Sequence, residues 1–142
     1  MKFFIASPWK NKEAVADLTT KLVERGHAVY SFLENGANLS TGMSIAEELE
    51  IFSKALSEWE NDSNIKKIFD SEMEGLSNSD AVILLQPAGH SSLLEAGIGY
   101  GMGKKIIIIG PIAKPEVVYL ISKSFYPDID SFVNNFNPPA TP

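Results

Sequence analysis

The chain has no cysteine and only two histidines among its 142 residues. The absence of cysteine excludes disulfide bridges and thiolate nucleophiles, and two isolated histidines do not form any of the common zinc-binding patterns. We therefore expect no metal ion and no other cofactor. Any chemistry must depend on carboxylates, hydroxyls or amides.

Basic residues and long hydrophobic runs are also scarce. Twelve Lys and Arg residues stand against 18 Asp and Glu, which gives a net charge of −6. No segment gathers enough positive charge to neutralise the phosphates of a nucleic-acid polymer. No apolar stretch approaches the roughly 18 to 20 residues that cross a bilayer, and the apolar run at the N-terminus is too short for a signal peptide. We expect a cytoplasmic protein that binds neither nucleic-acid polymers nor membranes.

Strand and helix patterns alternate along the chain. Short apolar runs typical of strands buried on both faces occupy 3–6, 28–32, 81–85 and 106–110. Helical patterns occupy 11–26, 44–60, 63–80 and 87–103, and the second of these begins with a capping box at Ser44 and Glu47. A short helix opened by Pro115, an edge strand at 123–126 and a last helix capped by Asp128 are expected to follow.

This order of elements predicts an α/β fold. We expect a single doubly wound, Rossmann- or flavodoxin-like parallel sheet of about five strands with helices on both faces. One domain would span 1–137, and 138–142 would be a flexible tail. The segment 33–42 reads as a loop of a length that is typical of functional lids. Ligands in such folds bind beyond the carboxyl ends of the strands, so the residues after Ala6, Leu85 and Gly110 are candidate site positions.

The segment "SLLEAGIGYGMGKK" at 92–105 follows one of these strand ends and carries four glycines at alternate positions. Each glycine inside a helix costs about 1 kcal/mol relative to alanine. Close helix packing explains Gly99 to Gly103, with Gly103 as the C-terminal cap. Gly97 lies nearer the strand end, where a missing side chain also lets a ligand approach the backbone.

Glu95, in the first turns of the same helix, is the more specific signal. A carboxylate there faces the expected ligand crevice, but it also interacts favourably with the helix dipole. The residues alone leave both interpretations open.

The sequence around Glu95 resembles a known family. "EAGIGYGMGKKIII" resembles the signature of the nucleoside 2-deoxyribosyltransferases, and "FDSEMEGLSNSDAVILL" is similar to their Asp-bearing helix and the strand after it. "FFIASPW" resembles their first strand and the loop that approaches the nucleoside, and "KPEVVYLISKSFYPDIDSF" resembles their C-terminal segment. The resemblance covers nearly the whole chain.

The resemblance implies roles for individual residues. Glu95 matches the nucleophile that attacks C1′ of the sugar, and Asp70 matches the acid that handles the proton of the departing base. An anion near the anomeric carbon and a protonated leaving group are what an oxocarbenium-like transition state needs. Ser7, Pro8 and Trp9 match the loop near the nucleoside. For Asp70, a solvated helix face is the alternative, and for Trp9 a core or interface position.

The chain departs from the family before the nucleophile. An acidic residue that holds the sugar 5′-hydroxyl is replaced by Gly89, His90, Ser91 and Ser92. Hydroxyls, an imidazole and backbone amides at a helix start suit a phosphate. The related 2′-deoxynucleoside 5′-monophosphate N-glycosidases also have Ser-rich turns there. Alternatively, one serine is only an N-terminal cap and His90 is solvated.

A second departure concerns assembly. The family's Asn after Lys-Pro, which completes the site of a neighbouring subunit, is replaced by Val117. The resemblance therefore does not imply a shared active site, although we still expect a homo-oligomer, a dimer or larger. Asp80, directly before a strand, is expected to be a structural cap, and Phe4 a core residue.

Together these observations predict an enzyme of the deoxyribosyltransferase or nucleotide N-glycosidase kind. It would cleave or exchange the N-glycosidic bond of a nucleoside or 5′-nucleotide through a covalent glycosyl intermediate on Glu95. Hydrolysis or transfer would follow from whether water or a second base is the acceptor. The alternative is a non-catalytic module that binds a nucleotide or a nucleotide-derived signal.

Overall fold

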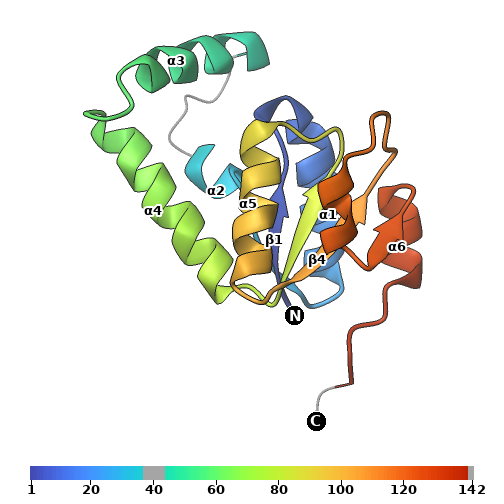
Figure 1. Cartoon of the computed structure of the whole chain (residues 1–142). Coiled ribbons are helices and arrows are strands. Elements are labelled where there is room, and N and C mark those ends of the chain that lie inside the picture. The colour runs from blue at the N-terminus through green and yellow to red at the C-terminus, as the bar shows by residue number, and fades with distance from the viewer. Residues whose placement is uncertain (37–43, 141–142) are drawn as a thin grey trace.

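A computed structural model describes residues 1–36 and 44–140. Its sheet has five parallel strands in the order β2-β1-β3-β4-β5, with helices on both faces (Figure 1). This is the flavodoxin-like order of a doubly wound sheet, so the predicted fold class is confirmed. The strands are β1 (Lys2–Ala6), β2 (Ala28–Tyr30), β3 (Ala81–Leu85), β4 (Lys105–Ile109) and β5 (Ser124–Tyr126). The helices are α1 (Lys12–Glu24), α2 (Leu33–Gly36), α3 (Ile45–Ser57), α4 (Ser63–Asn78), α5 (His90–Gly101) and α6 (Ile129–Asn135), with the 3-10 helices η1 (Trp9–Asn11) and η2 (Val117–Ile121).

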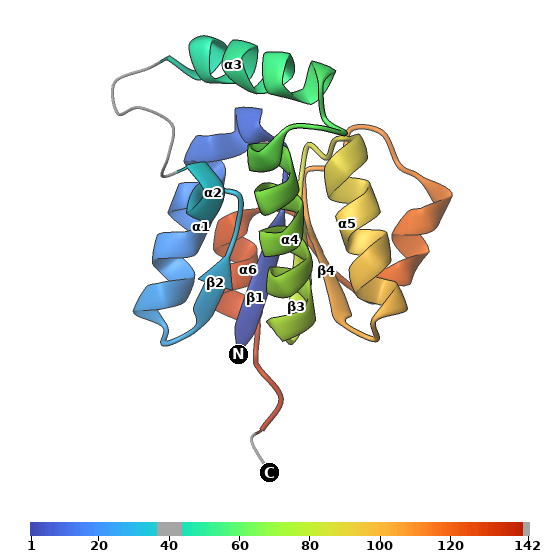
Figure 2. The same ribbon diagram turned by 90° about the vertical axis from the view of Figure 1, so that its left-hand side faces the viewer.

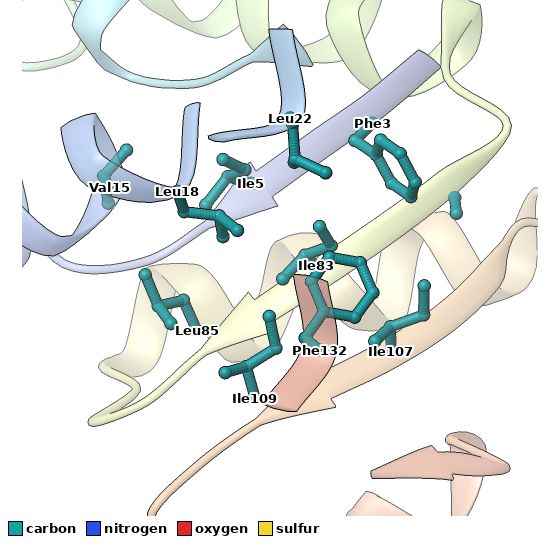
Figure 3. Packing of buried hydrophobic residues seen from close by; sticks show 11 residues of the cluster. Phe3, Ile5, Val15, Leu18, Leu22, Ile83, Leu85, Ile107, Ile109 and Phe132 are labelled. Atoms are coloured by element: carbon teal, nitrogen blue, oxygen red, sulfur yellow. The ribbon is translucent and has the colours of Figure 1, made fainter. Parts of the chain in front are cut away.

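The core lies in two layers, one on each face of the sheet. Side chains alternate between the faces along a strand, and the register places the odd-numbered residues of β1, β3 and β4 together. Phe3, Ile83 and Ile107 thus pack with α1 and with Phe132 of α6 (Figure 3). The even-numbered residues, such as Phe4, face α4 and α5 instead. Burial on both faces is why β3 is apolar throughout and why β1 and β4 are apolar after an exposed first lysine.

The predicted caps are present. Ser44 and Glu47 form a reciprocal capping box at the start of α3, and the side chain of Asp128 accepts a hydrogen bond from the amide of Ser131 at the start of α6. Asp80 accepts a hydrogen bond of 2.7 Å from the amide of Lys2 at the amino ends of the strands. The predicted structural role of Asp80 is therefore confirmed.

Several boundaries differ from the prediction. The segment that begins at Leu33 is a short helix rather than a loop, and 37–42 of the predicted loop lie outside the described residues. Helix α5 begins at His90 instead of 87, because Gly89 has an extended backbone conformation and is the N-terminal cap, with its amide bonded to the hydroxyl of Ser92. In residues 1–36 and 44–140, no helix is long and apolar enough to cross a bilayer.

The glycines of α5 have different environments. A Cβ at Gly99 would lie 2.6 Å from Cγ2 of Val82, whereas a Cβ at Gly97 would meet no atom within 4 Å. Gly103 has a φ of +79° after the helix, as expected of a C-terminal cap. Close packing therefore accounts for Gly99, and backbone conformation for Gly103. Close packing does not account for Gly101, where a Cβ would meet no atom within 4 Å.

We expect Gly99→Ala to destabilise the protein by about 1 to 3 kcal/mol, because the added methyl group must displace the β3 side chain beneath it. Gly97→Ala, in the same helix, is expected to be neutral or to stabilise by up to about 1 kcal/mol through helix propensity. Urea unfolding of both variants measures the difference. Equal effects would contradict the packing explanation.

Candidate active site

The carboxyl ends of β1 and β3 are joined by side-chain hydrogen bonds. The hydroxyl of Ser7 donates to the carbonyl of Leu85 at 3.0 Å and accepts from the amide nitrogen of Asn11 at 2.9 Å. The same side-chain nitrogen, Nδ2 of Asn11, also donates to the carbonyl of Pro87 at 2.9 Å. These bonds hold the loop after β1 against the loop after β3. Ser7 is thus a structural link, whatever contact it also makes with a ligand.

The start of α5 is held by hydrogen bonds between its own residues. The hydroxyl of Ser92 accepts from the amide of Gly89 at 2.7 Å and donates to its carbonyl at 2.9 Å. Ser92 is only 2% exposed, and a Cβ at Gly89 would lie 3.3 Å from Cγ of Pro8. The capping role that was one of the alternatives for these serines therefore describes Ser92. His90 and Ser91 remain exposed on the first turn.

Two half-buried carboxyl groups, Glu72 on α4 and Glu95 on α5, are close enough for the charge of the first to act on the second. Burial, and to a lesser extent the negative charge of Glu72, raises the pKa of Glu95 to about 8. Burial likewise raises the pKa of Glu72 to about 7. The two helices run side by side on the same face of the sheet (Figure 2). At neutral pH such a pair retains a proton that two solvated carboxyl groups would lose.

A shared proton suits two tasks at once. When two titratable groups differ in protonation, the ionised one is available as a nucleophile and the protonated one as an acid. Most glycosidases that retain the configuration at the anomeric carbon use a pair of carboxyl groups in these two roles. In the described part of the chain, no three His, Cys, Asp or Glu side chains are grouped so that they could hold a metal ion.

A cavity of about 650 Å³ opens beside Glu72. Its volume is in the range of small-molecule sites. Its apolar walls come from the loop after β1 and from the turn and helices that follow: Trp9, Phe32, Ile51, Phe52, Ile65 and Ile68. Its polar lining is mainly acidic, with Glu34, Asp70 and Glu72 against one cation, Lys67. The cavity thus suits an uncharged, largely apolar group rather than an anion.

Trp9 forms one wall of the cavity and is held in place by its neighbours. Its ring centroid lies 4.6 Å from that of Phe32, and its indole nitrogen donates to Glu48 Oε2 at 2.9 Å. An aromatic face held in this way suits stacking with a planar ligand. Trp9 therefore lines the cavity, and its contact with a nucleoside stays a prediction.

Of the remaining predicted residues, Asp70 is the one that lines this cavity. The side chain of Asp70 is exposed to solvent. Glu95 does not line the cavity, and it is related to it through Glu72, whose charge raises the pKa of Glu95. Gly97 is exposed, with open space where a side chain would be. Pro8 packs against the start of α5 and lines no described cavity.

Glu72 was missed by sequence reasoning, which selected Asp70 two residues earlier. A signal was available, because Glu72 is three and four residues before Gly75 and Leu76, the buried residues of α4. Helical neighbours at that spacing share a face, so Glu72 points inward and Asp70 does not.

The comparisons with known proteins agree with this fold. No protein-family model matches the chain, and no curated protein is similar to it in sequence. A 2-deoxyribosyltransferase from the psychrotolerant bacterium Bacillus psychrosaccharolyticus has a similar structure, with a TM-score of 0.69 and 17% identity over 96% of this chain and 93% of that chain. The CMP N-glycosidase BcmB of Clostridium botulinum gives a TM-score of 0.57 and 16% identity over 94% of this chain and 96% of that chain. The chain therefore has the doubly wound α/β fold of these two enzymes over nearly its whole length.

Proposed function

We propose that the protein is an enzyme that cleaves or exchanges the N-glycosidic bond of a nucleoside or a 5′-nucleotide. The observation that carries the proposal is the pair of half-buried carboxyl groups, Glu72 and Glu95, of which Glu72 lines an aromatic-walled cavity. The fold is shared with a 2-deoxyribosyltransferase and a CMP N-glycosidase, which supports this class of reaction.

In the proposed reaction, the carboxylate of Glu95 attacks C1′ while the bond from C1′ to the base nitrogen breaks. The electron pair of that bond leaves with the base, and the base takes the proton of Glu72. This step forms a glycosyl ester on Glu95 and leaves Glu72 as a carboxylate. In the second step, water or another base attacks C1′ and gives a proton to Glu72, and the carboxylate of Glu95 departs.

Glu72 replaces Asp70 in this proposal as the group that handles the proton. Both side chains line the cavity, but a general acid must hold its proton near neutral pH. Burial raises the pKa of Glu72 to about 7, below the value of about 8 for Glu95, so the reacting form, with Glu95 ionised and the proton on Glu72, is the less populated of the two singly protonated forms. Asp70 is exposed to solvent. Asp70 remains the assignment that the family resemblance implies, and it provides a matched control.

The lining of the cavity bears on the substrate. We place the base in the cavity, against Trp9, because the acidic lining disfavours a phosphate there. A 5′-phosphate, where the substrate has one, would then lie outside the cavity, and we assign its binding to His90 and Ser91, which are exposed on the first turn of α5. Gly97 would allow close approach of the sugar.

The test is chromatography of free base after incubation with ribo- and deoxyribonucleosides and their 5′-monophosphates. We expect base release from at least one substrate, and an added second base distinguishes transfer from hydrolysis. Release only from monophosphates would support the phosphate role of His90 and Ser91. Measurable binding with no release from any substrate would overturn the proposal in favour of the binding module.

We also propose that copies of the chain associate. Val117 and Leu120 of η2 are 85% and 84% exposed, and apolar side chains exposed together are typical of protein interfaces. Sedimentation equilibrium measures the association, and a monomer at micromolar concentration would contradict it.

A further inference from the structure

Glu48 is an acidic residue of α3 whose side chain is almost completely enclosed, at 4% exposure. Its partners lie far away in sequence, at the start of the chain. Glu48 Oε1 and Oε2 accept hydrogen bonds from Lys12 Nζ at 3.1 and 3.3 Å, and Oε2 also accepts from the Trp9 indole at 2.9 Å. The carboxylate thus connects α3 to η1 and α1.

The three side chains form a closed arrangement. The ammonium group of Lys12 lowers the pKa of Glu48, and the hydrogen bond from Trp9 also lowers it. Lys12 Nζ also lies 5.5 Å from the centroid of the Trp9 ring, within the range of a cation–π contact. Each of the three groups therefore contacts the other two, and Glu48 remains an anion at neutral pH.

Other attachments of α3 are few. The helix lies above the rest of the molecule in both views, away from the sheet (Figures 1 and 2), and its main packing partner is α4. Leu49 and Leu56 on α3 are exposed rather than packed. Elements with few buried apolar contacts open at low free-energy cost. The link through Glu48 therefore carries a large share of the docking of α3.

Helix α3 also forms a wall of the candidate site. Ile51, Phe52 and Ala55 line the cavity, and Glu48 lies one turn before Phe52 on the same helix face. On the opposite wall, Trp9 is fixed by the same carboxylate. A single side chain thus sets the position of two walls.

We propose that Glu48 is a positioning residue that holds α3 as a cover over the cavity and fixes the Trp9 ring within it, so that enclosure of a planar ligand and docking of α3 are coupled. The ligand class, an uncharged heteroaromatic base, rests on the proposed function. The docking of α3 does not, and it is testable without any ligand.

The test compares Glu48→Gln with Glu50→Gln, which removes the same charge from an exposed position on the same helix. In the ligand-free protein, Glu48→Gln is expected to speed amide hydrogen exchange in α3 by about tenfold or more, since a hydrogen-bonded charge pair is lost. In a Trp59→Phe background, Trp9 is the only remaining tryptophan. Glu48→Gln is then expected to shift the fluorescence emission of Trp9 to longer wavelength. Glu50→Gln should change neither signal.

Two further measurements separate positioning from general stability. With a substrate that the protein turns over, Glu48→Gln is expected to raise KM by about tenfold and to change kcat less than twofold, because Glu48 does not touch the carboxyl pair. Lys12→Met should speed amide exchange in α3 as Glu48→Gln does. Because both substitutions break the same ion pair, the double variant should exchange no faster than the faster of the two single variants.

Three outcomes would overturn the inference: unchanged exchange of α3 in Glu48→Gln, exchange that rises equally in all helices, or faster exchange of α3 with an unchanged KM. If wild-type protein releases no base, the proposed function fails, and the coupling is then tested by adding a millimolar nucleoside. Protection of α3 amides in the wild type but not in Glu48→Gln supports coupling, and protection in neither contradicts it.

Discussion

Replacement of Glu95 by Gln is expected to lower kcat for base release by roughly a thousandfold or more. The amide retains the size of the carboxyl group but cannot attack C1′, so no glycosyl ester forms. Initial rates of base release measure the effect, with Glu74→Gln, an exposed acid on α4, as the control that should retain activity. A rate for Glu95→Gln within tenfold of wild type would exclude Glu95 as the nucleophile.

The wild-type protein should also carry the sugar covalently during turnover. Acid quenching followed by peptide mass spectrometry is expected to find the mass of the sugar on the peptide that contains Glu95, and to find none in Glu95→Gln. Turnover without a trapped sugar, together with inversion at C1′, would instead indicate direct attack by water.

Stability provides the check that lost activity is not lost folding. The pKa of Glu95 is raised from 4.5 to about 8 in the folded protein, so the folded state binds a proton that the unfolded state releases in this interval. Stability therefore falls as the pH rises from about 4.5 to about 8. Glu95→Gln removes this loss, and the variant should be more stable than wild type at pH 8 and above, by a few kcal/mol at most, while the two converge below pH 4.5.

The sequence was sufficient for the fold because the strands are buried on both faces. Runs such as 81–85 and 106–110 are apolar at every position, which distinguishes them from the amphipathic helices between them. The caps at Ser44 and Asp128 were equally visible, since capping depends on residues three positions apart. Contacts between residues that are a few positions apart in the sequence can be predicted from local sequence patterns.

The site was less visible because its geometry depends on long-range packing. Glu48 meets Lys12 across 36 positions in the sequence, and Glu72 is buried only because α4 packs beside α5. The resemblance to the family selected Glu95, but it placed the second carboxyl group at Asp70. Asp70 is on α4 like Glu72, but its side chain is exposed. Burial of a charged side chain depends on how helices pack together in the folded chain. Sequence spacing shows only which residues share a helix face.

The same buried pair predicts a pH profile that identifies the acid. Activity requires one proton on the pair, so the wild-type rate should be highest between about pH 7 and 8, where the pair holds one proton. Glu72→Gln is expected to lower kcat by about 10² to 10⁴-fold for ordinary bases, since the departing base receives no proton. The alkaline decline of the profile should vanish with the acid, and the acidic limb should move to lower pH, because the charge that raises the pKa of Glu95 is gone.

The leaving group separates the loss of an acid from general damage. A base analogue that departs readily without protonation needs no general acid, so Glu72→Gln should cleave such a substrate at nearly the wild-type rate while Glu95→Gln should not. Asp70→Asn, the matched control two residues away, should retain both limbs of the pH profile. If Asp70→Asn instead removes the alkaline decline and Glu72→Gln retains it, the proton is handled by Asp70, as the family resemblance implies. The buried pair would then serve only to raise the pKa of the nucleophile.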